Sequence, residues 1–210
     1  MTAEEILYKV GIVPVIKMDC VEHAVPLAKA LANGGLPAAE ITFRSDAAAA
    51  SIAAIAKEVP EMFVCAGTVL TPETAQKAVD AGSKAIISPG LNLETVRWCV
   101  KKGVPVIPGT GTPSEVEACM REGLKLVKLF PAEVVGGVGM LKAMSGPYAG
   151  MKFMPTGGVK PNNAKEYLTQ KNVLCCGGTW IVPGNLLEAG DFGAIEKLAR
   201  EAAKLRDEVR

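Results

Sequence analysis

The sequence predicts a single (β/α)8 barrel, in which eight parallel strands close on themselves inside a layer of helices. Short apolar segments recur eight times, and their starts lie about 20–28 residues apart, the spacing of a strand–helix unit. These segments are apolar on both faces. Parallel strands of a barrel have this pattern, because helices cover their outer face and a packed interior covers their inner face. The length of 210 residues suits one barrel domain spanning residues 1–210. A doubly wound open sheet is the main alternative.

The eight expected strands are apolar runs bounded by glycine, proline or polar residues. They are Val13–Lys17, Ala38–Phe43, Phe63–Thr68, Lys84–Ser88, Pro105–Pro108, Lys125–Phe130, Lys152–Pro155 and Val173–Gly177. Thr2–Val10 is interpreted as an N-terminal helix that covers one end of the barrel, and Asp191–Val209 as the last outer helix.

Helix signals lie between the strands. Thr71-Pro72-Glu73 and Thr112-Pro113-Ser114-Glu115 each place a capping hydroxyl, a proline and an acid in a first helical turn. Ser45-Asp46 precedes an alanine-rich run in the same way, and Gly82 and Gly123 end two of the helices. The alternation of strand and helix is therefore complete along the chain.

Composition limits the possible partners. The chain has 23 basic and 22 acidic residues and only 5% aromatic residues, which gives nucleic-acid binding no support. Six cysteines without a C-x-x-C pair are expected to be reduced packing residues. Met1–Lys9 is too polar for a signal peptide, and no apolar run of about 20 residues could cross a membrane. We expect a cytoplasmic protein with a small-molecule partner.

Lys128 is the most informative single residue. Active-site residues of barrels lie at the carboxyl ends of strands, and Lys128 stands between apolar residues in the sixth strand. A buried lysine is costly without a partner or a use, and burial favours the neutral amine that attacks carbonyl groups. Two alternatives stay open: Lys128 extends to solvent or pairs with a buried acid, or Lys17 at the end of the first strand is the reactive amine.

Glu40, Thr42 and Arg44 alternate along the second strand and share one face. One interpretation is a structural ion pair between Glu40 and Arg44. The other is a proton-transfer acid beside an anion-binding cation, since the arginine fork donates two parallel hydrogen bonds to a carboxylate.

Glycine-rich turns end the seventh and eighth strands, at Thr156-Gly157-Gly158 and at Gly177-Gly178-Thr179. Barrels often bind phosphate at this place through backbone N–H groups, and glycine permits the close approach. A metal site has little support, because His23 is the only histidine and no His or Cys cluster accompanies it. Magnesium held by carboxylates stays open.

Six motifs, in order along the chain, together resemble the 2-keto-3-deoxy-6-phosphogluconate (KDPG) aldolase family, some of whose members also cleave 4-hydroxy-2-oxoglutarate (KHG). The motifs are Glu40-Ile-Thr-Phe-Arg44, Ala66-Gly-Thr-Val-Leu70, Ser88-Pro-Gly-Leu91, Lys128-Leu-Phe-Pro-Ala-Glu133, Pro155-Thr-Gly-Gly158 and Gly177-Gly-Thr-Trp180. The resemblance runs from about Ile12 to the C-terminus. It implies a class I aldolase, usually a homotrimer, that needs no metal or other cofactor and forms an imine on lysine.

The resemblance also implies roles for individual residues. Lys128 would form the Schiff base, and Glu40 would be the general acid and base. The remaining implied contacts are Arg44 and Thr68 to the pyruvate carboxylate, Pro89 and Phe130 along the pocket wall, and Gly157, Gly158, Gly178 and Thr179 to a phosphate. The implied reaction cleaves KDPG, a 2-keto-3-deoxy acid, to pyruvate and glyceraldehyde 3-phosphate.

Other functions stay open. The first is cleavage of KHG to pyruvate and glyoxylate. The others, from different classes, are a sugar-phosphate isomerase and a non-catalytic barrel that binds a phosphorylated ligand. Reduction of a substrate imine onto the protein would separate an aldolase from both of these.

Overall fold

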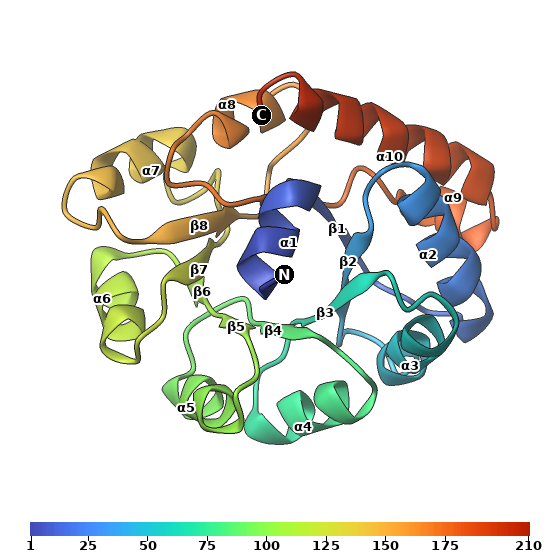
Figure 1. Cartoon of the computed structure of the whole chain (residues 1–210), viewed down its shortest axis with the longest axis horizontal. Coiled ribbons are helices and arrows are strands. Elements are labelled where there is room, and N and C mark those ends of the chain that lie inside the picture. The colour runs from blue at the N-terminus through green and yellow to red at the C-terminus, as the bar shows by residue number, and fades with distance from the viewer.

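The chain folds as a curled parallel sheet inside a ring of helices (Figure 1). The computed structural model describes all 210 residues. Every strand pair in it is parallel. Helix α1 (Ala3–Val10) lies over the middle of the ring in this view, as expected of a helix that covers one end.

The strands are β1 (Ile12–Ile16), β2 (Ala38–Thr42), β3 (Phe63–Gly67), β4 (Ala85–Ile87), β5 (Val106–Ile107), β6 (Gly109–Thr110), β7 (Leu126–Leu129), β8 (Lys152–Pro155) and β9 (Cys176–Gly178). They form a six-stranded part in the order β5-β4-β3-β2-β1-β9 and a three-stranded part in the order β6-β7-β8. Each of the eight expected strands overlaps a strand of the structure. The fifth expected strand, Pro105–Pro108, contains β5 and ends before β6, which was not expected.

Proline explains the division of the fifth strand. Pro108 lies between β5 and β6 and has no N–H for the ladder, although its carbonyl accepts a hydrogen bond from the Lys128 N–H at 2.9 Å. At the other edge of β8, isolated bridges pair Phe153 with Val173 and Thr156 with Gly177. The expected start of the last strand at Val173 is wrong, because the chain bonds first to β8 and joins β1 only from Cys176 onward.

The helices are α2 (Ala24–Asn33), α3 (Ala48–Glu58), α4 (Pro72–Asp80), α5 (Leu93–Lys102), α6 (Pro113–Arg121), α7 (Gly137–Ser145), α8 (Ala164–Leu168), α9 (Gly184–Glu188) and α10 (Phe192–Asp207), with a short 3-10 turn at Val21–His23. The expected helix starts at Thr71 and Thr112 are confirmed, since each hydroxyl accepts a backbone N–H of the first turn. The expected cap at Ser45 is wrong, because its hydroxyl donates to the Met18 carbonyl and α3 has no side-chain cap.

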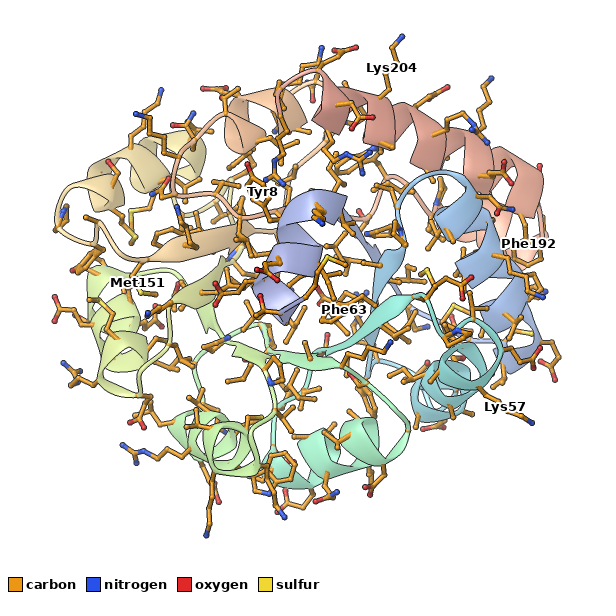
Figure 2. The ribbon with its side chains drawn as sticks, in the orientation of Figure 1. Tyr8, Lys57, Phe63, Met151, Phe192 and Lys204 are labelled. Atoms are coloured by element: carbon orange, nitrogen blue, oxygen red, sulfur yellow. The ribbon has the colours of Figure 1, made fainter.

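The sheet is covered on both sides. Every residue of β1, β2 and β3 is buried, and Leu7 of α1 is fully buried against the sheet. Charged side chains such as Lys57 and Lys204 project outward from the helices (Figure 2). All six cysteines are free thiols, and five are buried, as expected of packing residues. No helix is both long enough and apolar enough to cross a membrane.

Candidate active site

Lys128 and Glu40 meet inside the curled sheet. β7 contributes Lys128 and β2 contributes Glu40, so the pair joins the two parts of the sheet across the interior. Lys128 Nζ lies 3.0 Å from Oε1 and 3.4 Å from Oε2 of Glu40. The two residues are 4% and 1% exposed. Each charge is therefore removed from water and compensated by the other, without which its burial would be strongly unfavourable.

Residues of neighbouring strands determine the space and the charge environment around Lys128 and Glu40. Gly67 of β3 leaves room for the carboxylate, since a Cβ there would lie 2.3 Å from Glu40 Oε1. The Phe130 ring centre is 5.2 Å from Lys128 Nζ, a cation–π distance. Burial raises the pKa of the Cys65 thiol well above its usual value, and the nearby Glu40 charge raises it further. The interior therefore combines one amine, one carboxylate and a protonated thiol.

The structure decides between alternatives that the sequence left open. Lys17 lies on the exposed rim, where its amine pairs with Asp19 at 2.8 Å. Glu40 pairs with Lys128 rather than with Arg44, which forms no ion pair within the chain. Lys128 is thus a buried amine with an acid partner, and Arg44 keeps its charge uncompensated.

Thr42 connects Arg44 to the sheet. Its hydroxyl donates to the Ile16 carbonyl at 2.9 Å and accepts a hydrogen bond from Arg44 Nε at 3.0 Å. Thr42 is 1% exposed, and its hydroxyl has these two groups as its hydrogen-bond partners. The arginine is fixed through Nε, which leaves the two terminal nitrogens of its fork free to bind an anion. Sequence reasoning placed Thr42 on the right face of the strand but gave it no role.

These residues surround a pocket of about 270 Å³, here called the central pocket. It is lined by Val15, Glu40, Thr42, Arg44, Thr68, Pro89, Lys128, Phe130, Thr156, Gly157, Gly158, Val159, Gly177 and Thr179. Nine of the ten site residues expected from the sequence are in this set. Gly178 is not, because its backbone lies against Trp180, whose ring a Cβ at that position would meet at 1.9 Å.

Thr68 has an unusual backbone for a residue with a side chain. It follows β3 with φ 56°, and no other non-glycine residue of the chain has positive φ. A β-branched residue in the left-handed region is strained, and such strain is tolerated mainly at functional positions. The conformation keeps Thr68 at the wall of the central pocket.

The Gly157–Gly158 turn presents its N–H groups without acceptors. Gly157 and Gly158 have φ values of 97° and 83°, which favour glycine. Their carbonyls are bound, by the Glu133 N–H at 3.1 Å and by Asn163 Nδ2 at 3.1 Å, whereas neither N–H donates to an acceptor within the chain. Two unpaired donors at the edge of a pocket can bind an anion.

Comparison with known proteins agrees with this geometry. A family model described as KDPG and KHG aldolase matches residues 3–198. The chain belongs to the KDPG and KHG aldolase family. It is 49% identical over 203 residues to the KHG/KDPG aldolase of Escherichia coli strain K12, a match that covers 97% of this chain and 95% of that protein. The chain is accordingly an aldolase, an enzyme of the aldehyde-lyase class.

Solved structures of aldolases have the same fold as this chain. The KDPG aldolase of Legionella pneumophila, with pyruvate captured at low pH as a covalent carbinolamine intermediate, has a TM-score of 0.92 and 36% identity over 95% of this chain and 97% of that one. The KDPG aldolase of Zymomonas mobilis ZM4 with 3-phosphoglycerate has a TM-score of 0.90 and 36% identity over 95% of this chain and 94% of that one.

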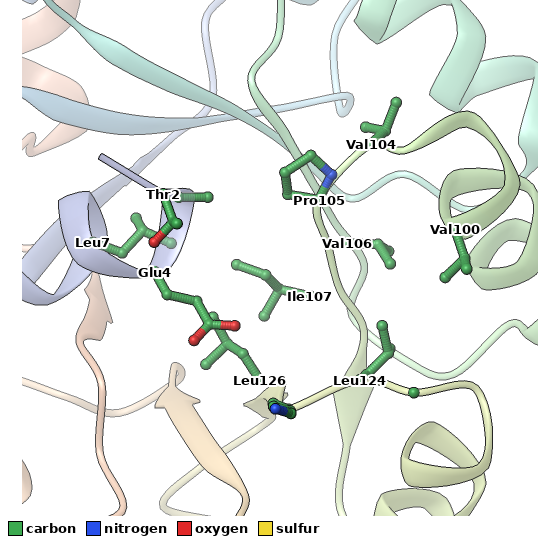
Figure 3. Close-up of a pocket in the computed structure, with 13 residues that line it drawn as sticks. Thr2, Glu4, Leu7, Val100, Val104, Pro105, Val106, Ile107, Leu124 and Leu126 are labelled. Atoms are coloured by element: carbon green, nitrogen blue, oxygen red, sulfur yellow. The ribbon is translucent and has the colours of Figure 1, made fainter.

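A larger pocket of about 490 Å³ lies elsewhere on the aldolase, at the amino ends of β5 and β7 (Figure 3). Thr2, Glu4 and Leu7 of the α1 region line it together with apolar residues such as Val106 and Leu126. It contains no buried pair of charges. The smaller central pocket is the better candidate for catalysis, because there a buried amine and a buried carboxylate are in contact and line one space with unpaired N–H donors.

No group of three or more His, Cys, Asp or Glu side chains is arranged to hold a metal. The single histidine of the aldolase, His23, packs edge-on against the Phe192 ring with 5.4 Å between the ring centres. It lies outside the set of residues that line the central pocket.

Proposed function

We propose that this aldolase cleaves KDPG to pyruvate and glyceraldehyde 3-phosphate through an imine on Lys128. The observation that carries the proposal is the buried contact between Lys128 and Glu40 at the floor of a pocket lined by anion-binding groups. A lone buried amine would have no proton acceptor, whereas Glu40 lies at 3.0 Å and can take one proton from the ammonium group. The neutral amine that results is the nucleophile.

Formation of the imine uses both residues. The Lys128 amine attacks the C2 ketone, and the resulting carbinolamine loses its hydroxyl as water when Glu40 supplies a proton. The iminium then withdraws electrons from the C3–C4 bond. That bond breaks as the C4 hydroxyl loses its proton to the Glu40 carboxylate, which releases the aldehyde and leaves an enamine. Glu40 returns this proton to C3 of the enamine, and hydrolysis of the imine then releases pyruvate and restores Lys128.

Arg44 and Thr68 bind the carboxylate of the substrate in this proposal. The terminal nitrogens of the Arg44 fork suit a carboxylate, and its Nε is already fixed by Thr42. Pro89 and Phe130 line the wall beside the reacting carbons. Because the carboxylate is held at one end, C2 is directed toward Lys128, and such orientation lowers the barrier to attack.

The phosphate binds at the opposite end, where the Gly157 and Gly158 N–H groups and the Thr179 hydroxyl line the central pocket. Gly178, implied by the resemblance, contributes no pocket surface and is proposed only as the small residue that lets Trp180 pack against β9. The Zymomonas mobilis aldolase solved with 3-phosphoglycerate supports a phosphorylated acid as the ligand class.

Cleavage of KHG to pyruvate and glyoxylate is the second candidate. The relative from Escherichia coli carries both substrates in its name, KHG/KDPG aldolase. The imine chemistry is the same for both, so only the phosphate end of the pocket separates the two substrates.

We also propose that the curled sheet closes into a complete barrel. Only Pro108 separates β5 from β6, and bridges at Phe153 and Thr156 join β8 to the segment that leads into β9. These contacts support one closed (β/α)8 barrel and a single domain spanning residues 1–210. A homotrimer that works without a metal stays a prediction from the resemblance, and a cytoplasmic location stays a prediction from the sequence. Light scattering after size-exclusion chromatography would measure the assembly.

Imine trapping tests the chemistry directly. Incubation with pyruvate and borohydride, followed by digestion and mass spectrometry, should place the adduct on Lys128. The matched variants are Lys128→Met, which should not be labelled, and Lys17→Met, which should be labelled as the unaltered protein is. An adduct on Lys17, or no adduct, would contradict the proposal.

A further inference from the structure

Glu133 and Tyr167 form a contact beside the Gly157–Gly158 turn that the chemistry above does not use. Glu133 follows Pro131 after β7, and Tyr167 belongs to α8. Tyr167 is fully buried, and its hydroxyl donates to the Glu133 carboxylate. The hydroxyl and the carboxylate both pack against Gly137, where a Cβ would lie 2.9 Å from the tyrosine oxygen and 3.1 Å from Glu133 Oε1.

Glu133 touches the turn in two ways. Its N–H donates to the Gly157 carbonyl at 3.1 Å. Its side chain fills the space beside Gly158, since a Cβ at residue 158 would lie 2.3 Å from Glu133 Cγ and 2.7 Å from Glu133 Cβ. The side chain of Glu133 therefore sets how far the turn can move toward β7.

The Glu133 carboxylate lies close to the proposed phosphate site, where its negative charge would weaken phosphate binding by repulsion. We therefore expect Glu133 to have a structural role that outweighs this repulsion. The contact with Tyr167 indicates this role, because the hydrogen bond from the buried Tyr167 hydroxyl fixes the orientation of the Glu133 side chain. Burial and the neighbouring carboxylate raise the pKa of Tyr167 above its usual value. The hydroxyl therefore remains a donor at neutral pH.

We propose that Glu133 and Tyr167 are positioning residues that hold the Gly157–Gly158 turn in the shape that binds the substrate phosphate. The inference rests on the proposed phosphate role of that turn. It assigns the discrimination between phosphorylated and unphosphorylated substrates to two residues that need not touch either one.

The test compares kcat/KM for KDPG with kcat/KM for KHG, together with inhibition by 3-phosphoglycerate. Tyr167→Phe keeps the buried ring and removes only the hydroxyl. We expect it to lower kcat/KM for KDPG about tenfold, the usual effect of losing one hydrogen bond to a charged group, and to weaken 3-phosphoglycerate inhibition equally. The values for KHG, and the rate of pyruvate labelling by borohydride, should stay within about twofold.

Three further variants make the test specific. Glu133→Ala should behave like Tyr167→Phe, whereas Glu133→Gln should retain the preference for KDPG, because its amide oxygen can still accept a hydrogen bond from the tyrosine hydroxyl. Tyr148→Phe is the matched control, since Tyr148 also donates to a glutamate, Glu117 at 2.9 Å, but outside the central pocket. Tyr148→Phe should leave kcat/KM for both substrates and the inhibition by 3-phosphoglycerate unchanged.

The outcomes separate this inference from the proposed function. An unchanged preference in Tyr167→Phe, an equal loss on both substrates, or Glu133→Gln behaving like Glu133→Ala would overturn the positioning role alone. Equal efficiency of the unaltered enzyme on KDPG and KHG would overturn the phosphate role of the turn, and this inference with it. A selective loss in Tyr167→Phe and Glu133→Ala supports both.

Discussion

The amine of Lys128 lies 3.0 Å from a carboxylate oxygen of Glu40, although 88 residues separate them in the chain. Both residues are nearly inaccessible to water, so the pair is an acid and a base held in contact at the floor of the central pocket. A proton can pass along this contact without solvent.

Glu40→Gln should lower kcat by about 10²–10⁴-fold, the usual contribution of a general acid or base. The amide keeps the size of the carboxylate but cannot accept the ammonium proton, so both imine formation and enamine protonation slow down. Exchange of the pyruvate methyl protons in deuterated water measures the second step by NMR. Exchange at the unaltered rate in Glu40→Gln would mean that Glu40 only balances the charge of Lys128.

Gly67→Ala should reduce kcat/KM by about 100-fold, because displacement of a catalytic group by about 1 Å can have this effect. A methyl group at residue 67 would lie 2.3 Å from Glu40 Oε1 and must push the carboxylate away from Lys128. Gly90→Ala is the matched control, since no atom lies within 4 Å of a Cβ there. Steady-state kinetics measures kcat/KM for both variants, and thermal unfolding verifies that both are folded. Similar losses in both variants would argue against a steric effect on Glu40.

Thr42→Val should raise the pyruvate concentration needed for half-maximal borohydride labelling about tenfold and leave the maximal labelling rate little changed. Valine has the same shape but cannot accept the 3.0 Å hydrogen bond from Arg44 Nε, so the arginine loses its fixed orientation. Thr42→Ser restores the hydroxyl and should restore the affinity. If Thr42→Ser is impaired and Thr42→Val is not, the methyl group rather than the hydroxyl matters at this position.

Exhaustive chelation should leave the rate of KDPG cleavage unchanged. In the proposed mechanism the iminium on Lys128 withdraws the electrons that a divalent metal withdraws in metal-dependent aldolases. The assay compares turnover before and after dialysis against a chelator. A loss that a divalent cation restores would place the chain in a different mechanistic class.

Alkaline pH should destabilise the fold through its buried thiols. Burial raises the pKa of Cys175 to about 12, from an ordinary value of 9.0. Above pH 9 the unfolded chain releases this proton while the folded chain retains it, so the free energy of unfolding falls as the pH rises toward 12. The expected loss is about 1.4 kcal/mol per pH unit for such a thiol. Urea unfolding at pH 8 and pH 10 should show a smaller difference for Cys175→Ala than for the unaltered chain, and equal differences would contradict the assignment.

Local patterns in the sequence predicted most of the secondary structure. Apolar runs and capping residues act over a few neighbours, so the strands and the helix starts at Thr71 and Thr112 could be identified from them. Ser45 shows the limit of such patterns. Its hydroxyl donates to the Met18 carbonyl, which is distant in the sequence, and does not cap the first turn of α3.

The sequence by itself determined that Lys128 stands in a buried strand and that Glu40 and Thr42 share one face of another, because hydropathy and the two-residue period of a strand are local properties. The expected extension of that face to Arg44 is wrong, since β2 ends at Thr42 and Arg44 lies in the bend that follows. Only the tertiary structure decided that Glu40 pairs with Lys128 and not with Arg44, and that Lys17 is left at the rim. The physical reason is that a strand pattern specifies which face a side chain occupies. Which residue lies across the interior depends on how the strands curl and register in three dimensions.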